Sequence, residues 1–279
     1  MPYYDHGNAK IYYEETGQGE PIIAIHGLSE NSLYWKQVAE ILSGHYRFIA
    51  MDMRGHGRTV VEKEPYGFDA DTIGKDIIAL ADHLDIDRFH LLTHATGGIA
   101  AVRHAMEDSS RIATLILTNT GSATSPFPGS SKIISKFNDR LAGTFEKFDW
   151  EQIVENLKNN PGPFFRGIME SESSDQLMEQ AREILSPGDR HLIARFIRSF
   201  YTDPDPKAEG LRKISCPVLI IYGEKDDLFI QSSKLMAKEI PEAKLIEYQD
   251  VGHMTALEVP AILSKDVMGF IDSTVPRSQ

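Results

Sequence analysis

The stretch Thr93-His94-Ala95-Thr96-Gly97 has the spacing of a catalytic turn. It stands where a short apolar run gives way directly to a helical pattern, and small residues flank its centre. In this setting a small-x-nucleophile-x-small pattern holds an attacking side chain at the apex of a tight, strained turn. The apex residue here is Ala95, whose methyl group cannot attack a substrate. The sequence therefore predicts a site for nucleophilic catalysis in which the attacking atom is missing.

The residues on either side of this turn predict the elements that hold it. A mostly apolar run over residues 89–92 predicts a buried strand, and a helical pattern follows over residues 99–106. Gly97 and Gly98 come just after the turn, where the lack of a side chain lets a helix pass close to neighbouring backbone. The sequence thus predicts a strand, a very tight turn and a helix in direct succession.

The composition is that of an acidic globular protein. Among 279 residues, 41% are hydrophobic and the net charge is −12. A surface for nucleic acids or anionic membranes is not expected, because phosphate binding needs clustered Lys and Arg. A single cysteine, Cys216, excludes an internal disulfide. The first residues show no basic region followed by an apolar run, and no stretch approaches about 18 apolar residues, so we expect a cytoplasmic protein without a membrane span.

Strand and helix patterns alternate along most of the chain. Apolar runs and alternating patterns predict strands at residues 10–15, 21–25, 46–52, 89–92, 113–119, 217–223 and 243–248. Apolar residues at helical spacing predict helices at residues 34–42, 71–84, 99–106, 232–240 and 260–271. Such alternation implies a mostly parallel sheet with helices on both faces.

The stretch from residue 122 to residue 210 interrupts this alternation. It begins with a loop rich in Ser, Thr, Pro and Gly, and then shows helical spacing without a convincing strand. We therefore predict a doubly wound α/β core formed by residues 1–121 and 211–279, with an all-helical lid over residues 122–210. Ligands of open α/β sheets bind at the carboxyl ends of the strands, so we expect a mostly apolar pocket between those ends and the lid.

Four further motifs resemble those of the α/β-hydrolase superfamily, and they come in that family's order at the predicted strand ends. Two of them are His26-Gly27, which resembles the oxyanion-hole turn, and Asp52-Met53-Arg54-Gly55-His56-Gly57-Arg58, which resembles the D-x-R-G-x-G-x-S signature with Thr59 in place of Ser. The others are Gly223-Glu224-Lys225-Asp226, which resembles the turn that presents the acid, and Gly252-His253, which with Glu258 and Pro260 resembles the histidine loop. The resemblance covers nearly the whole chain outside the lid and implies the α/β-hydrolase fold.

The resemblance also implies roles for single residues. The family's turn is Gly-x-Ser-x-Gly, so Ala95 stands in place of the nucleophilic serine, and Thr93 in place of the first glycine is a modest change. The family's order of nucleophile, acid and base implies Asp226 as the acid, with Asp227 as its competitor, and His253 as the base. Two explanations of Ala95 remain. Either a serine was replaced by alanine to arrest catalysis, or the chain is a natural protein that does not carry out the family's hydrolytic reaction.

The oxyanion hole and its supports follow from the same resemblance. The backbone N–H groups of Leu28 and Thr96 are expected to bind the oxyanion, because backbone donors need no reorganisation when charge develops. The amide of Thr96 also lies at a helix N-terminus, where the partial positive charge favours an anion. Asp52 and Arg54 are expected to hold a buried network that positions the loops.

Candidates for substrate contact are His26, Gly27, Trp35 and His94. For His26 and His94 the alternative is a purely structural role within their turns, and for Trp35 it is a place in the apolar core. His90 and His94 are four residues apart, but they straddle a strand and a turn, and no third ligand has a recognisable spacing. We therefore expect no metal site and no cofactor.

These features favour a carboxylic-ester or lactone hydrolase that uses a Ser-His-Asp type triad and is inactivated by Ala95. The expected partner is a small-molecule ester or lactone, and a monomer or a homodimer is expected. The alternatives on the same fold are C–C bond hydrolysis, perhydrolysis and cofactor-free oxygenation. A ligand receptor or other non-catalytic binding protein is the alternative of a different class, which the missing nucleophile would suit and the presence of Asp226 and His253 would not.

Overall fold

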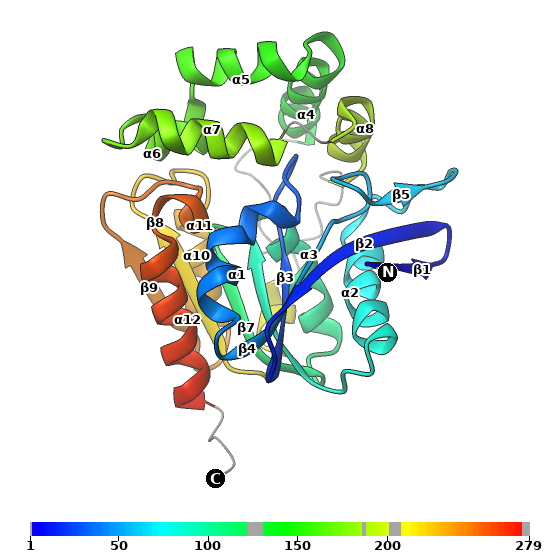
Figure 1. Ribbon diagram of the computed structural model, residues 1–279, viewed down its shortest axis with the longest axis vertical. Helices are drawn as coiled ribbons and strands as arrows, with labels where there is room; N and C mark the ends of the chain where they lie inside the picture. The colour runs from blue at the N-terminus through cyan, green and yellow to red at the C-terminus, as the bar shows by residue number, and fades with distance from the viewer. Residues whose placement is uncertain (1, 122–130, 186–187, 201–207, 275–279) are drawn as a thin grey trace.

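The computed structural model describes residues 2–121, 131–185, 188–200 and 208–274. A single sheet lies at its centre, with strand order β1-β2-β4-β3-β6-β7-β8-β9 and with β5 paired to β2 (Figure 1). The strands are β1 (Tyr3–His6), β2 (Ala9–Thr16), β3 (Glu20–Ile25), β4 (Tyr46–Met51), β5 (Val60–Val61), β6 (Phe89–His94), β7 (Ile112–Thr118), β8 (Val218–Gly223) and β9 (Lys244–Tyr248).

The sheet is parallel through most of its width. All pairings along β4-β3-β6-β7-β8-β9 are parallel, whereas β2 pairs antiparallel with β1, β4 and β5. Every residue of β6, β7 and β8 is buried, which is why apolar residues predominate in β7 and β8 and polar residues of β6, such as His90 and Thr93, have hydrogen-bond partners inside the fold. The predicted mostly parallel α/β sheet is therefore confirmed.

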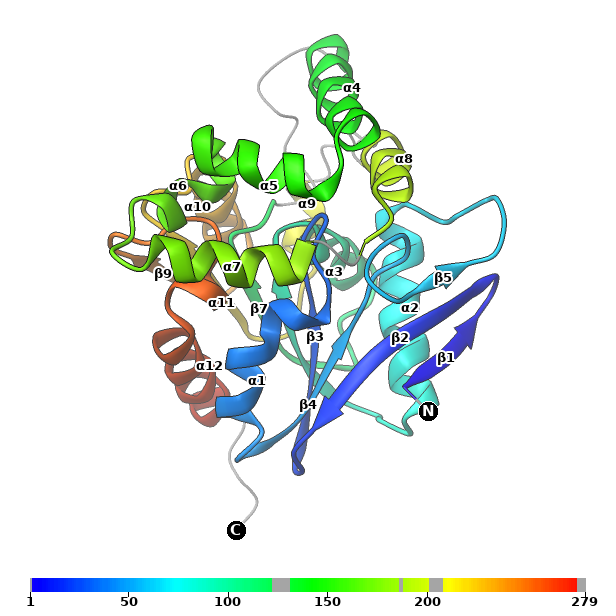
Figure 2. The same cartoon turned by 45° about the horizontal axis from the view of Figure 1, so that its top comes forward.

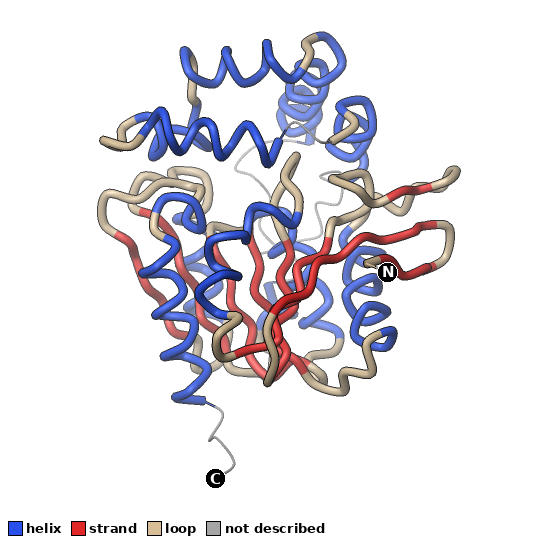
Figure 3. Tube along the Cα trace, in the orientation of Figure 1, coloured by secondary structure: helices blue, strands red, loops and turns tan. Residues whose placement is uncertain are grey.

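Successive side chains of the sheet face two separate apolar cores. In β3, Ile23 and Ile25 join one core, and Ile22 and Ala24 join the other, as the two-residue repeat of a strand requires. Helices cover both cores, so the strands lie between two helical layers (Figure 3). The first core is covered by α2 (Ala70–His83), α3 (Ala95–Glu107) and α10 (Ile230–Glu239), and the second by α1 (Lys36–Leu42) and α12 (Pro260–Thr274).

A further layer of helices lies over the carboxyl ends of the parallel strands (Figure 2). It consists of α4 (Ser131–Lys147), α5 (Trp150–Asn159), α6 (Gly162–Met169), α7 (Ser174–Leu185) and α8 (Arg190–Phe200). Asn31, in the loop after β3, donates a hydrogen bond to the Ile184 carbonyl of α7 at 2.5 Å. The described part of residues 131–200 contains no strand. The predicted lid boundary at residue 122 lies outside the described residues, and the division into core and lid stays a prediction.

Several short elements depart from the predicted ranges. The predicted helix over residues 34–42 divides into a 3₁₀ turn at Ser32–Trp35 and α1. Neither the short strands β1 and β5 nor the single turns α9 (Ala208–Leu211) and α11 (Thr255–Glu258) were predicted, because so few residues show no clear period. None of the helices that the structure describes has both the length and the apolar content of a membrane span.

Gly97 determines how closely α3 packs against the end of β3. A Cβ atom added at Gly97 would lie 2.5 Å from the His26 carbonyl oxygen and 2.6 Å from Ile25 Cγ2. The Gly97 N–H donates to the same His26 oxygen at 3.1 Å. This contact confirms the close backbone approach that the glycine pair predicts.

We expect Gly97→Ala to lower the free energy of unfolding by about 1–3 kcal/mol, because the new methyl group overpacks against backbone. Gly143→Ala is the matched control, since a Cβ at Gly143 meets no atom within 4 Å. Alanine inside a helix such as α4 is more stable than glycine by about 0.5–1 kcal/mol, so this variant should be stabilised. Urea unfolding measures both changes. Equal stability of the two variants would contradict the close approach at Gly97.

Candidate active site

Ala95 forms the tight turn between β6 and α3. Its φ of 44° is positive, a conformation that costs an ordinary residue about 1–3 kcal/mol and persists only where the surroundings fix it. The Thr120 hydroxyl donates a hydrogen bond to the Ala95 carbonyl, and the hydrogen bond from Gly97 to His26 fixes the first turn of α3. Strand, turn and helix follow one another as the sequence predicts, with Ala95 at the apex.

His253 and Asp226 meet at the carboxyl ends of β9 and β8. His253 Nδ1 lies 2.9 Å from Asp226 Oδ2, and both side chains are buried. Asp226 stands in a turn closed by a hydrogen bond of 3.0 Å from its N–H to the Gly223 carbonyl. Asp227 is 68% exposed and pairs with Arg166 at 3.2 Å. Of the two acids considered from the sequence, Asp226 is the one that contacts the imidazole.

Two residues to which the sequence assigned no catalytic role hold this pair in place. Asn119 Nδ2 donates to Asp226 Oδ2 at 2.8 Å and to the Gly252 carbonyl at 3.2 Å, so it joins the acid to the histidine loop. Glu258 accepts hydrogen bonds from the N–H groups of Gly252 at 2.8 Å and Met254 at 2.9 Å, on either side of the histidine. Glu258 belongs to a predicted motif, whereas Asn119 had no signal of its own.

The His253 ring lies among aromatic side chains. Ring centroids are 5.4 Å from Phe229 in a stacked arrangement, 5.0 Å from Phe164 edge-on, and 4.6 Å from His94. Burial alone would lower the pKa of His253, but the adjacent Asp226 carboxylate raises that pKa above its ordinary value. A histidine oriented by a carboxylate can accept a proton and return it, as general acid–base catalysis requires.

The turn after β3 lies against the Ala95 methyl group. A Cβ added at Gly27 would lie 3.0 Å from Ala95 Cβ. The Gly27 N–H donates to Glu30 Oε2 at 2.6 Å, so this amide is occupied within the turn. Leu28 is half-buried in the same turn, and Thr96 is buried in the first turn of α3. The two predicted oxyanion donors therefore belong to the segments on either side of Ala95, and their donor role stays a prediction.

His26 and Trp35 lie in the interior of the fold. His26 Nδ1 donates to the Gly27 carbonyl at 2.7 Å, and its Nε2 accepts from the Met53 N–H at 3.0 Å, so both ring nitrogens serve the turn. Burial lowers the pKa of His26 to about 4, which keeps the ring neutral. Trp35 is fully buried and packs edge-on against Tyr34, with ring centroids 4.8 Å apart. The geometry gives both residues structural positions, the alternative to substrate contact.

The His94 ring is fully buried behind the turn and meets a carboxylate that the sequence analysis missed. It stacks on Tyr34 with ring centroids 4.5 Å apart, and its Nδ1 lies 3.2 Å from Thr118 Oγ1. Its Nε2 lies 3.5 Å from Glu30 Oε1. Burial would raise the pKa of Glu30, but the neighbouring His94 lowers that pKa below its ordinary value. The only sequence signal for Glu30 is an acidic residue just after the His26-Gly27 motif.

Asp52 and Arg54 are both buried, and each joins segments that are distant in the sequence. Asp52 accepts hydrogen bonds from the N–H groups of Ser32 at 2.6 Å and Arg58 at 2.7 Å, and so ties two loops together. Arg54 forms a two-bond ion pair with Asp76 of α2, at 2.7 and 2.9 Å. Both residues are thus buried and hydrogen-bonded as predicted, but through two separate sets of contacts.

The two histidines at the spacing of metal ligands have other partners. His90 Nδ1 lies 2.9 Å from Thr114 Oγ1, and His90 Nε2 lies 3.3 Å from Glu20. His94 points its Nδ1 at Thr118. In the ranges that the structure describes, no three His, Cys, Asp or Glu side chains are grouped so as to hold a metal ion.

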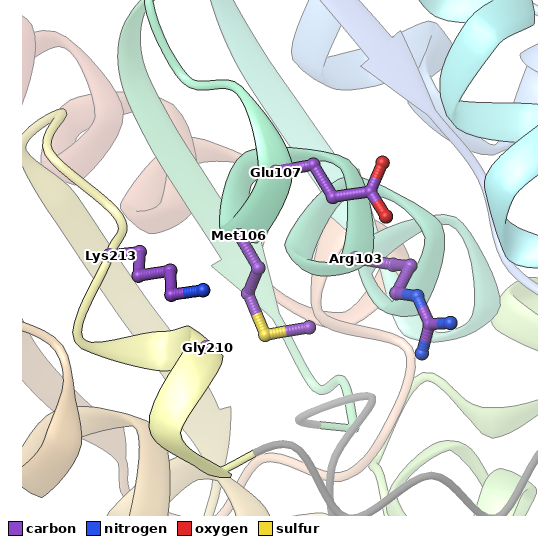
Figure 4. Close-up of a pocket in the computed structure, with 5 residues that line it drawn as sticks. All are labelled: Arg103, Met106, Glu107, Gly210 and Lys213. Carbon is purple, nitrogen blue, oxygen red and sulfur yellow. The ribbon is translucent and has the colours of Figure 1, made fainter.

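Two cavities in the described part of the chain lie away from Ala95. The first, of about 220 Å³, lies between α3 and α9 and is lined by Arg103, Met106, Glu107, Gly210 and Lys213 (Figure 4). The second, of about 340 Å³, is lined by residues 64–69 together with Arg195 and Ser199. Neither is the predicted apolar pocket, because neither is lined by Ala95, Asp226 or His253.

Comparison with known proteins gives consistent matches. Residues 20–260 match the family model described as alpha/beta hydrolase fold. A non-heme chloroperoxidase of Streptomyces lividans is 27% identical to this chain, over 94% of the chain and 96% of the relative. The structure of MenH from S. aureus matches with a TM-score of 0.83 at 22% identity, covering 95% of this chain and 98% of that one. The enol-lactonase from Burkholderia xenovorans LB400 matches with a TM-score of 0.80 at 22% identity, covering 97% and 99%.

We expect Asp226→Asn to lower the pKa of His253, because the substitution removes the carboxylate that raises it. Since the folded pKa is raised, charged His253 stabilises the fold fully below its unfolded pKa of about 6.5, and this contribution is lost as pH rises through the folded value. Asp226→Asn should therefore cost more stability at low pH than at high pH. NMR titration of the ring and urea unfolding at about pH 6 and pH 9 measure both effects.

Asp227→Asn is the matched control for this prediction. Asp227 is the next residue and is also acidic, but it is exposed and pairs with Arg166. Its substitution should leave the His253 titration unchanged. A shift as large as that of Asp226→Asn would show that Asp226 is not the partner of the imidazole.

Proposed function

Because this chain belongs to the alpha/beta hydrolase family, we propose that it acts on small-molecule carboxylic esters or lactones through a site whose nucleophile position holds Ala95. The observation that carries the proposal is the buried hydrogen bond between His253 and Asp226. The base of this pair lies next to the turn at Ala95, since the His253 and His94 rings are in contact. A histidine oriented by a carboxylate is the general base of acyl-transfer sites.

In this proposal His253 moves the protons. Its Nδ1 donates to Asp226, so Nε2 accepts a proton from the attacking group and later returns it to the leaving oxygen. The backbone N–H groups of Leu28 and Thr96 stabilise the oxyanion that forms between these steps. Ala95 cannot bond to the acyl group, so the chain as it stands forms no acyl-enzyme.

The ester and lactone class has two supports. An enol-lactonase is among the solved structures that share this fold, and a lactone is a cyclic ester. The site also combines a base with two backbone amides on either side of Ala95, which is what attack on an ester carbonyl requires.

A ligand-binding protein without turnover is the second candidate, and Ala95 is the observation that favours it. Such a protein needs no nucleophile. The His253–Asp226 pair favours the hydrolase, because burying an ionisable pair costs solvation free energy that a binding site lined by apolar residues would avoid.

We expect Ala95→Ser to raise kcat on p-nitrophenyl esters of short acids by several orders of magnitude, since removal of the serine from a comparable triad costs about a millionfold. The turn already holds a Cβ atom at position 95, so the added hydroxyl group needs little adjustment. A burst of p-nitrophenol in the variant, absent from the parent chain with Ala95, measures acyl-enzyme formation.

The double variant Ala95→Ser with His253→Ala is the control for the triad. The serine and the base act as a unit, so the rate of the double variant should fall back to within about tenfold of the parent's rate. If Ala95→Ser brings no gain on a panel of esters and lactones, the proposal of a serine-type hydrolase fails. If the parent chain also hydrolyses none of these compounds faster than buffer does, the binding protein takes its place.

A further inference from the structure

Glu30 places a second buried carboxylate beside Ala95. Its Oε2 accepts a hydrogen bond from the Gly27 N–H at 2.6 Å. Oε2 and Ala95 Cβ each lie 3.0 Å from the point where a Cβ on Gly27 would sit, so the two atoms are at most twice that distance apart. Glu30, Ala95 and His253 are 4%, 5% and 3% exposed, so each keeps a small accessible area.

His94 holds the Glu30 carboxylate from the opposite side. The Thr118 hydroxyl has one proton, which it donates to the Thr93 carbonyl at 2.9 Å. His94 Nδ1 therefore carries a proton and donates it to Thr118 Oγ1, which lies 3.2 Å away. In a neutral ring Nε2 then carries a lone pair. This buried atom has no hydrogen-bond partner among the described residues and faces Glu30 Oε1 at 3.5 Å.

The contact between His94 and Glu30 requires a proton. Two facing lone pairs repel, so one proton shared between Nε2 and Oε1 satisfies both buried atoms. The pair then carries no net charge, which reduces the cost of burying it. Whichever atom holds the proton, Glu30 Oε2 stays a hydrogen-bond acceptor, with one lone pair beyond the one that Gly27 uses. His94 is thus a positioning residue for an acceptor beside the turn.

We propose that Glu30 Oε2 and His253 Nε2 together hold a hydrolytic water beside the Ala95 methyl group, so that this chain cleaves its substrate by direct attack of water. The inference rests on the ester or lactone class of the proposed function. A serine hydroxyl brings one proton to such a site, whereas a water molecule brings two and is oriented fully only by two acceptors. His253 is the first acceptor and Glu30 is the second.

The reaction balances without a covalent enzyme intermediate. As the water oxygen bonds to the carbonyl carbon, one water proton passes to His253 Nε2, and the other stays on the new hydroxyl group and hydrogen-bonds to Glu30. The bond from the carbonyl carbon to the leaving oxygen then breaks, and the His253 imidazolium returns its proton to that oxygen. The products are a carboxylic acid and an alcohol, joined in one molecule for a lactone. Glu30 keeps its protonation state throughout.

Glu30→Leu removes the second acceptor, and its effect should depend on the residue at position 95. In the parent chain we expect kcat on a p-nitrophenyl ester to fall about a hundredfold, because a poorly oriented nucleophile loses about that much rate. In the Ala95→Ser background the serine oxygen attacks first. Glu30→Leu should therefore lower the rate constant of the acylation burst by no more than about tenfold, compared with about a hundredfold for the parent's kcat. Glu30→Gln keeps an oxygen that can occupy the place of Oε2, so this variant of the parent chain should retain most of the parent's kcat.

Glu20→Gln is the matched control. Glu20 also contacts a buried histidine of β6, His90, at 3.3 Å, but it is 52% exposed and lies at the start of β3, the opposite end from Ala95. This substitution should change neither the parent's turnover nor the acylation burst. If the burst of the Ala95→Ser, Glu30→Leu variant has the same amplitude as that of Ala95→Ser, loss of Glu30 leaves the fold intact.

The outcomes separate this inference from the proposed function. Equal losses in the parent's turnover and in the acylation burst would make Glu30 merely structural and overturn the water site. A parent that hydrolyses esters no faster than buffer, while Ala95→Ser is active, would also overturn it and leave the proposed function standing. If Ala95→Ser gains nothing but the parent's rate still depends on Glu30, the serine framework fails and the water site stands.

Discussion

The positive φ of 44° at Ala95 is the constraint on which the rest of the site depends. Because the strand ends and the helix begins at this residue, its side chain is presented at the carboxyl edge of the sheet. The strain is offset by the hydrogen bond from Thr120 and by the close packing of Gly97 against the end of β3. The same packing brings the turn after β3 against Ala95, so this turn, the apex and the N-terminus of α3 form one packed unit.

Among the histidine–carboxylate contacts of the described residues, those of His90, His94 and His253 differ in their surroundings. His90 and Glu20 meet at the solvent-exposed start of the strands, where water screens the interaction and little depends on it. The other two carboxylates, Asp226 and Glu30, are buried near Ala95, where an unpaired charge would be costly. Two buried groups that can share a proton with a histidine thus lie near Ala95, as expected for acid–base chemistry.

The helices over the strand ends restrict access to these groups. Phe164 of α6 packs edge-on against the His253 ring. A Cβ added at Gly167 of α6 would lie 2.6 Å from Gly252 Cα, so this helix rests directly on the histidine loop. A base enclosed in this way exchanges protons with few water molecules, and electrostatic interactions are strong where water is scarce. A single water molecule is held in one orientation more readily in such an enclosed site than in a cleft filled with solvent.

The sequence by itself determined the long strands and helices, the α/β class and the places of Ala95 and His253, because apolar periodicity and short turn motifs are local properties of the chain. Only the tertiary structure decided between Asp226 and Asp227, and only it revealed Asn119, which meets Asp226 across 107 positions of sequence. It also placed Glu30 against His94. The physical reason is that these contacts join the ends of different strands, and the order of strands in the sheet is set by packing among distant segments, which no local pattern encodes.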